Sequence, residues 1–406
     1  MAALIPRYTL QAARKQTTCI AAVATVQTNH YSSQPPRVIK NPTTASLKRG
    51  TGGRSSFNGI VCTVFGATGF VGRYVCNRLG KIGTQLIIPY RGDMYNCLPL
   101  KLCGDLGQIL FHPFHLRDDE SIRKCIKYSN VVINLIGRDW ETRNFTFHEV
   151  HVEGARRLAR LCKEANVEHF IHVSALNVTN DLESHVLDGG SQFLRTKWEG
   201  ECAVREEFPE ATIIRPSNIW GQEDRFLRMY AGMMRHHFRT VPLWEKGEKT
   251  EKQPVAVYDV GKGIAAVAKD PRNTAGKTYQ FVGPNRYKLS ELLDWFHRIR
   301  IRDPVEDGYM RINLKYAPLF KLKVTLNEFI STAYPLGNLQ WEHLEREAVS
   351  DKISKALPTL EDLGIELTTM ESRVHWELKP FRKDIQYMES VGEFDPVPNP
   401  PTIPIH

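Results

Sequence analysis

The chain has 406 residues, of which 42% are apolar and 24% charged, values that exclude a disordered, fibrous or collagen-like protein. No apolar run approaches the roughly 18 to 20 residues of a membrane-spanning helix, the strongest candidates being 60–65 and 131–136. The net charge of +9 comes almost entirely from residues 1–58, which hold eight of the 54 Lys and Arg and no acidic residue. The remaining 46 basic and 45 acidic side chains leave no basic excess that would favour nucleic acid as a partner.

Residues 1–45 have the composition of a mitochondrial transit peptide. They are rich in Ala, Ser and Thr, place apolar residues opposite Arg7 and Arg14 at helical spacing, and contain no acid, the first in the chain being Asp93. Cleavage is expected before about residue 50, with 46–58 as a linker to the folded part. A disordered basic tail on a cytosolic protein is the alternative.

A strand, a glycine-rich turn and a helix follow the linker. The β-branched run 60–65 leads directly into Gly66, Gly69 and Gly72, and apolar residues at helical spacing continue through 73–79. These glycines allow a tight turn, close approach of the backbone to a pyrophosphate, and packing of the helix on the strand. A glycine turn without a ligand is the alternative. The predicted cofactor contacts in this segment are Gly66, Ala67, Thr68, Gly69, Phe70, Val71 and Gly72.

The second strand, 85–90, decides which cofactor the sequence favours. Arg91 follows it directly, 25 residues after Gly66. NAD-preferring sites usually carry an acidic residue at this position, whereas an arginine favours the 2′-phosphate of NADP(H). Arg91 therefore points to NADPH. Asp93 is the rival residue, and the glycine spacing alone also admits NADH or FAD in the same crevice.

The following segments alternate as a parallel sheet requires. Strands are predicted at 109–114, 131–136 and 169–173, with helices at 119–128 and 153–165 between them. The pattern predicts a Rossmann-type, doubly wound α/β fold.

The carboxyl ends of two of these strands supply further candidate contacts. Leu135, Ile136 and Gly137 close the strand at 131–136, and Ser174 follows the strand at 169–173. Ligands of open parallel sheets bind at this edge. We therefore expect all four residues to line the dinucleotide crevice.

Five motifs together resemble the atypical, extended short-chain dehydrogenases. They are Gly66xxGly69xxGly72, Asn134-Leu-Ile-Gly137, Val173-Ser-Ala175, Phe193-Leu-Arg-Thr-Lys197 and Arg215-Pro-Ser-Asn-Ile-Trp-Gly221, in that family's order and spacing. The longer runs 53–69, 134–141 and 170–174 are similar to the nucleotide-binding accessory subunits of mitochondrial respiratory complex I. This second likeness extends from about residue 53 to about 300 and more loosely beyond.

The resemblance implies NADPH on the glycine turn, with Arg91 toward the 2′-phosphate and Ser174, Lys197 and Pro216 lining the pocket. Active relatives use a Tyr and a Lys four residues apart, and Phe193 occupies the Tyr position here. A benzyl ring exchanges no proton, so no catalytic residue is assigned. The resemblance therefore implies a non-catalytic subunit on the matrix side of the inner membrane, with other complex I subunits as its partners.

A free mitochondrial NADP-dependent oxidoreductase or epimerase is the alternative function. It would require another proton donor, for which Tyr230, Tyr258 and Asp259 are the downstream candidates. No metal is predicted, because the eight cysteines contain no CxxC and the paired histidines lack a further ligand at a suitable spacing.

The sequence divides the folded part into three sections. Residues 59–221 are expected to bind NADP(H), 222–390 to form a smaller C-terminal lobe with an interaction surface, and 391–406 to be a Pro-rich extended tail. An arm lying on a neighbouring chain and simple disorder both suit this tail. The charged run 245–252 is predicted to be a solvated loop. Residues 314–330 suit a contact with a membrane surface or a partner, or a core helix with its lysines outward.

Overall fold

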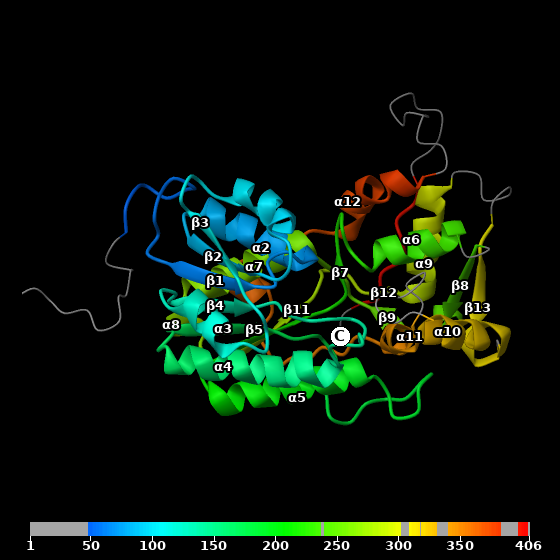
Figure 1. The fold of residues 1–406 in the computed structure, drawn as a ribbon. Helices are drawn as coiled ribbons and strands as arrows, with labels where there is room; N and C mark the ends of the chain where they lie inside the picture. The colour runs from blue at the N-terminus through cyan, green and yellow to red at the C-terminus, as the bar shows by residue number, and fades with distance from the viewer. Residues whose placement is uncertain are drawn as a thin grey trace, which may run out of the picture. The chain divides into compact units, whose positions relative to one another are not determined.

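A seven-stranded parallel sheet forms the centre of the fold, with strand order β11-β6-β5-β4-β1-β2-β3 (Figure 1). The computed structural model describes residues 48–236, 239–301, 308–316, 318–330, 340–382 and 397–404, so the predicted transit peptide lies outside the described residues. The strands are β1 (Val61–Phe65), β2 (Gln85–Tyr90), β3 (Ile109–Pro113), β4 (Val131–Asn134), β5 (His169–Val173), β6 (Thr212–Pro216) and β11 (Thr278–Phe281). The predicted doubly wound α/β fold is confirmed.

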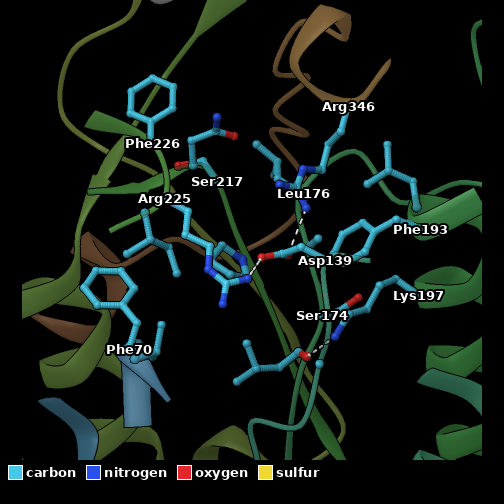
Figure 2. Close-up of a pocket in the computed structure, with 18 of the residues that line it drawn as sticks. Phe70, Asp139, Ser174, Leu176, Phe193, Lys197, Ser217, Arg225, Phe226 and Arg346 are labelled. Atoms are coloured by element: carbon cyan, nitrogen blue, oxygen red, sulfur yellow. Dashed lines mark hydrogen bonds and ion pairs between the residues drawn. The ribbon is translucent and has the colours of Figure 1, made fainter. Parts of the chain in front are cut away.

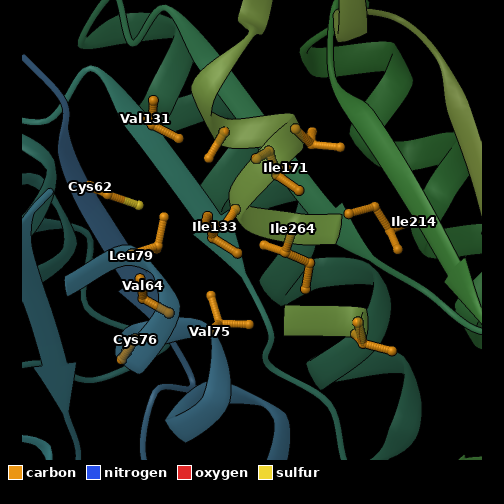
Figure 3. Close-up of a cluster of buried hydrophobic side chains, with 14 of the residues drawn as sticks. Cys62, Val64, Val75, Cys76, Leu79, Val131, Ile133, Ile171, Ile214 and Ile264 are labelled. Carbon is orange, nitrogen blue, oxygen red and sulfur yellow. The ribbon is translucent and has the colours of Figure 1, made fainter. Parts of the chain in front are cut away.

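Helices cover both faces of this sheet (Figure 1). One face carries α2 (Phe70–Lys81) and α7 (Val257–Lys269), and the other carries α3 (Asp119–Ile126), α4 (Gly154–Glu164) and α5 (Gln192–Glu207). The core explains why β4 is apolar along its whole length. Val131 and Ile133 pack among the side chains of α2 and α7 (Figure 3), whereas Val132 packs on the opposite face against α3 and α4.

The strand predicted at 131–136 is two residues shorter in the structure. The side chain of Asn134 turns back and its Oδ1 accepts the N–H of Ile136 at 3.0 Å. This local hydrogen bond replaces the next rung of the sheet, so β4 ends at Asn134. The N–H of Leu135 still donates to the carbonyl of Phe65 in β1 at 3.0 Å, and Ile136 and Gly137 then continue as a loop at the carboxyl edge of the sheet.

The smaller lobe is built mainly of helices and two-stranded sheets. It contains α6 (Leu227–His236), β8 (Thr240–Leu243), α9 (Leu289–Arg300), β13 (Met310–Asn313), α10 (Pro318–Ile330), α11 (Trp341–Ala348) and α12 (Met370–Glu377), and the pairs β7 (Ile219–Trp220) with β10 (Val255–Ala256) and β9 (Glu251–Lys252) with β12 (Tyr287–Lys288). Short helical segments occur in both parts of the fold. They are Met94–Cys103, Glu149–Glu153, Trp244–Gly247, α8 (Pro271–Thr274), Leu314–Tyr316, Glu361–Leu363 and Lys379–Phe381.

The sheet does not end at the expected boundary at residue 221. β11 pairs with β6 at the sheet edge, and α7 packs against α2. Both elements follow residue 221, so the nucleotide-binding part also draws on residues that the sequence assigned to the smaller lobe. Burial of apolar side chains explains why α7 belongs to this part. Ile264 of α7 is fully buried in the cluster between the sheet and the helices on that face.

Helix α10 presents apolar side chains both inward and outward. Val324 is buried against Leu314, whereas Leu322, Leu326 and Phe329 are exposed. The helix is therefore neither wholly a core helix nor wholly a surface helix, and its contact with a membrane or a partner stays a prediction. In the part of the chain that the structure describes, no helix combines the length and apolar character needed to cross a bilayer.

The described part of the Pro-rich tail, 397–404, lies on its own chain. The N–H of Ile403 donates to the carbonyl of Arg286 at 2.8 Å, and Val397 packs against the core of the smaller lobe. These described residues contact the smaller lobe of the same chain, and a contact of the tail with a neighbouring chain stays a prediction.

Candidate nucleotide-binding site

Three glycines shape the turn between β1 and α2. Gly66 has φ +82°, and a Cβ there would lie 3.0 Å from the carbonyl carbon of Leu135. A Cβ on Gly72 would lie 2.6 Å from the Cα of Ala67, so α2 packs this closely only without a side chain. Gly69 precedes α2, and no side chain caps the first turn of the helix. The N–H groups of that turn are therefore available to an anion at the positive end of the helix dipole.

Two cavities, of about 340 and 330 Å³, meet at this turn and share Gly66, Gly69, Leu135, Gly137 and Arg138. We call the first the α5-side cavity and the second the β2-side cavity. Thirteen predicted contact residues line one or both of them: Gly66, Thr68, Gly69, Phe70, Val71, Gly72, Arg91, Leu135, Ile136, Gly137, Ser174, Lys197 and Pro216. Ala67 is the exception, because it is fully buried beneath the turn. The structure thus brings the predicted residues together, and their role toward a cofactor stays a prediction.

Arg91 lines the β2-side cavity with its hydrogen-bonding capacity unused. Among the described residues its side chain has no hydrogen bond or ion pair, and its guanidinium carbon lies 5.6 Å from the ring centroid of Phe145. Asp93, the rival residue, instead accepts the N–H of Tyr95 at 2.9 Å and caps a helical segment. A cationic donor therefore faces this cavity, and the carboxylate does not line it.

The α5-side cavity holds the residues that would surround a nicotinamide ribose (Figure 2). Phe193 and Lys197 lie one turn apart on α5, and Ser174 follows β5. The Nζ of Lys197 donates to the carbonyl of Val173 at 3.2 Å, while the buried Oγ of Ser174 has no hydrogen-bond partner in the described structure. A Cβ on Gly137 would lie 3.2 Å from Lys197 Nζ, so the glycine makes room for the ammonium group.

Lys197 is held in an unusually dry environment. Burial lowers the pKa of its ammonium group to about 8, against the opposing effects of Asp139 and Glu201. The neighbouring Phe193 is only 7% exposed, and its ring offers no titratable group. Active relatives of the resembled family have a lysine and a tyrosine at these two positions. This chain keeps the lysine, with a pKa of about 8, and has the hydrocarbon ring of Phe193 in place of the tyrosine.

A charge cluster that the sequence did not reveal lies among the residues that line this cavity (Figure 2). The carboxylate of Asp139 accepts hydrogen bonds from Arg225 and, at 3.1 Å, from Arg346. Burial alone would raise the pKa of Asp139, but the two guanidiniums outweigh it and hold that pKa well below its usual range. Arg346 also lies 4.8 Å from the ring centroid of Phe193, so its side chain occupies the space in front of that ring.

Helix α11 supplies most of the residues that sequence reasoning missed. Glu342 accepts the N–H of Phe193 at 2.8 Å, and Glu347 accepts from the amide of Asn218 at 3.0 Å. Lys252, expected in a solvated loop, is 1% exposed and donates to the carbonyl of Val349 at 2.8 Å. The expectation was wrong because β9 pairs with β12, which directs this ammonium group to the carbonyls that follow α11.

None of the three candidate replacements for the missing phenol lines the α5-side cavity, and Asp259 instead accepts a hydrogen bond from Lys262 at 2.7 Å. The hydroxyl of Tyr230 donates to Glu347 at 3.0 Å and that of Tyr258 to Glu377 at 3.1 Å, and neither tyrosine lines the α5-side cavity. The described residues also include no group of three or more His, Cys, Asp or Glu side chains placed to hold a metal ion.

Comparison with known proteins identifies the family. Residues 62–281 match the model of the NAD dependent epimerase/dehydratase family. The chain is 48% identical to mouse "NADH dehydrogenase [ubiquinone] 1 alpha subcomplex subunit 9, mitochondrial", with 80% of this chain and 82% of the relative covered. The chain belongs to the subunit 9 family within the epimerase/dehydratase family. A more distant member, the Neurospora crassa "NADH-ubiquinone oxidoreductase 40 kDa subunit, mitochondrial", is 36% identical, with 84% of each chain covered.

Solved structures of an oxidoreductase and of an epimerase share the fold. The NADPH-dependent quinone oxidoreductase of Escherichia coli, complexed with NADPH, superimposes with a TM-score of 0.57 at 16% identity, covering 78% of this chain and 99% of that one. The UDP-glucuronic acid 4-epimerase of Bacillus cereus gives a TM-score of 0.52 at 15% identity, covering 75% of this chain and 97% of that one. At such identities the likeness establishes the fold alone.

The residues of this subunit 9 chain fit a nicotinamide dinucleotide. The glycine turn is a cradle that side chains would fill, as the contacts of a Cβ on Gly66 and Gly72 show. Ser174 Oγ is a buried polar atom without a partner in the described structure, and Arg91 is a cation with unused donors. Buried polar atoms normally have partners, so Ser174 Oγ is expected to meet a polar ligand, whereas Arg91 is an exposed cation whose donors face the cavity.

Proposed function

We propose that this chain is an accessory, non-catalytic subunit of mitochondrial complex I that holds NADPH as a structural or sensing cofactor. The observation that supports the proposal is the cavity at the glycine turn, which Phe193, Lys197 and Ser174 line together. The names of the mouse and Neurospora relatives support membership of the respiratory complex. A location on the matrix side of the inner membrane agrees with the transit-like leader at 1–45.

Each part of the groove has a role in holding the nucleotide. The turn Gly66–Gly72 and the start of α2 would bind the pyrophosphate, and Arg91 would bind the 2′-phosphate. Ser174 and Lys197 would hold the nicotinamide ribose. These contacts use backbone N–H groups and two cations, so they give affinity for a dinucleotide whether or not a reaction follows.

The same groove lacks what a turnover enzyme needs. Bound NADPH supplies a hydride, and reduction of a carbonyl also requires a positioned proton donor. Phe193 supplies none, and Arg346 fills the space in front of its ring while paired with Asp139. The chain therefore retains cofactor binding without the acid–base group.

A retained nucleotide would stabilise the fold and so the assembly. A ligand that binds only the folded chain contributes about 4 kcal/mol at a thousandfold excess over its Kd. That is a large share of the roughly 5 to 15 kcal/mol that holds a domain folded. Assembly of the complex should therefore depend on the nucleotide through the stability of this subunit.

Replacement of Gly69 by Asp tests the proposal. The new carboxylate would stand at the mouth of the glycine turn and repel the pyrophosphate, whereas Gly232→Asp adds the same charge to α6, where a Cβ meets open space. We expect Gly69→Asp alone to lose the nucleotide, measured by mass spectrometry of small molecules released from the full chain, and to reduce the large assembly on native gels. Normal assembly of a variant without nucleotide would contradict the structural-cofactor role.

A free NADP-dependent oxidoreductase or epimerase is the second candidate, favoured by the intact Lys197 and Ser174. It predicts a small soluble species and NADPH turnover that Lys197→Ala abolishes. We expect the native chain to migrate in a large inner-membrane assembly and to show no such turnover.

A further inference from the structure

The β2-side cavity is bordered by an aromatic side chain that contacts two arginines. Phe145 lines the cavity, and the guanidinium carbons of Arg91 and Arg117 lie 5.6 and 4.5 Å from its ring centroid. Both distances are those of cation–π contacts. The ring thus connects a cavity-lining arginine to a second arginine outside the cavity.

The two arginines differ in how firmly they are held. Arg117 donates to the carboxylate of Glu149 at 2.7 Å and to the carbonyl of Asn144 at 2.8 Å. In the described structure Arg91 has no such hydrogen bond or ion pair; it contacts the ring of Phe145 and is repelled by the charge of Arg138. Arg117 therefore fixes the ring, and the ring in turn restrains the otherwise unanchored Arg91.

We propose that Phe145, fixed by Arg117, is a positioning residue that sets the preference for NADPH over NADH by restraining Arg91 toward the 2′-phosphate. The inference rests on the proposed binding of NADPH. A planar guanidinium binds a phosphate best when its fork is already oriented, because less side-chain freedom is then lost on binding. Only NADPH carries the phosphate that benefits, so the effect falls on selectivity.

The charges around the ring support this role. Arg138 also lines the cavity and adds a second positive charge, while the carboxylate of Glu149 is already paired with Arg117. Among the described residues Arg91 itself has no ion pair with a carboxylate. A dianionic phosphate would supply the compensation that the protein does not.

A simpler role for Phe145 makes a different prediction. If the ring is only an apolar wall for the adenine, its loss weakens NADPH and NADH to the same extent, because both carry the adenine. If the ring restrains Arg91, its loss weakens NADPH alone. The ratio of the two dissociation constants therefore separates the two roles.

The test measures the binding of NADPH and of NADH to the full chain, by titration calorimetry on protein freed of nucleotide, for three variants and one control. Phe145→Leu keeps an apolar side chain, Arg117→Gln releases the ring, and Arg91→Gln removes the phosphate partner. Arg143→Gln is the matched control, because Arg143 is an exposed arginine of the same loop without a hydrogen bond or ion pair in the described structure. Thermal unfolding of each variant verifies that it folds.

We expect Phe145→Leu and Arg117→Gln each to weaken NADPH about two- to fivefold, the range of an exposed cation–π contact, with NADH binding unchanged. Arg143→Gln should change neither, and Phe145→Leu should add nothing in an Arg91→Gln background. Equal losses for both nucleotides, or no loss from Phe145→Leu, would overturn the inference. If Arg91→Gln leaves the NADPH preference intact, the proposed NADPH site itself fails.

Discussion

Substitution of Gly72 by Ala tests whether the glycine turn is built for close packing. A Cβ at this position would lie 2.5 Å from the carbonyl oxygen of Gly66 and 2.6 Å from both the Cα and the carbonyl oxygen of Ala67. All three are backbone atoms of the turn. Such overpacking costs typically about 1 to 3 kcal/mol, and the upper end applies because backbone cannot swing aside. The higher helix propensity of Ala compared with Gly offsets about 1 kcal/mol of this loss in stability. The free energy of unfolding should therefore fall by about 2 kcal/mol.

Gly232→Ala provides the matched control for this prediction. Gly232 also lies inside a helix, α6, but a Cβ there meets nothing within 4 Å. The propensity gain then acts alone, and the chain should become more stable by up to about 1 kcal/mol. Urea denaturation of both variants measures the difference, which should be about 3 kcal/mol.

Nucleotide binding gives the same experiment a second readout. Displacement of α2 would move its first-turn N–H groups away from the pyrophosphate, so NADPH should protect Gly72→Ala less than the wild type or Gly232→Ala. Each tenfold loss of affinity removes about 1.4 kcal/mol of that protection. If Gly72→Ala proves as stable as Gly232→Ala and is protected equally by NADPH, the close-packing argument is refuted.

Three further predictions concern the α5-side cavity. Phe193→Tyr should leave NADPH oxidation, followed by absorbance with small carbonyl substrates, at background, because Arg346 still blocks the ring; measurable turnover would refute this. Asp139→Asn should lower the free energy of unfolding, measured by urea denaturation, by about 1 to 3 kcal/mol, because Arg225 and Arg346 lose their carboxylate partner. Asp181→Asn on the exposed surface should leave it unchanged. Because the Lys197 pKa falls from 10.5 to about 8 on folding, the unfolded chain binds more protons at this side chain between these values, and the contribution of Lys197 to stability should rise with pH there, by at most about 3 kcal/mol. Burial raises the pKa of thiols such as Cys62 and Cys162, which act in the opposite direction in both proteins, so the measurement is the difference between the wild type and Lys197→Met in pH-dependent urea curves.

The local part of the site follows from the sequence because its causes are local. Gly66, Gly69 and Gly72 lie only three residues apart in the chain. The turn that they form is placed by the β-branched strand before them and by the helix after them. The carboxyl ends of β4 and β5 meet the same edge because parallel strands must. Thirteen predicted contacts accordingly line the groove.

The charge cluster does not follow from the sequence because its causes are distant. Arg346 pairs with Asp139 across 207 positions of the chain, and no periodicity or motif marks either residue as a partner of the other. Lys252 was misjudged for the same reason, since a charged run usually faces solvent unless tertiary contacts supply carbonyl acceptors. The boundary at 221 failed because the pairing of β11 with β6 depends on packing between distant segments.

Phe193 and Arg346 are best understood as one unit. The ring face contacts the Arg346 guanidinium at 4.8 Å and the Lys197 ammonium at 6.0 Å, so the benzyl group serves as a platform for two cations. Arg346 is in turn neutralised by Asp139, and Glu342 of the same helix accepts the N–H of Phe193. A phenol at this position would restore one reactive group and leave the Arg346 guanidinium over the ring face. We therefore expect that regaining a reaction requires changes in α11 as well as the return of a hydroxyl.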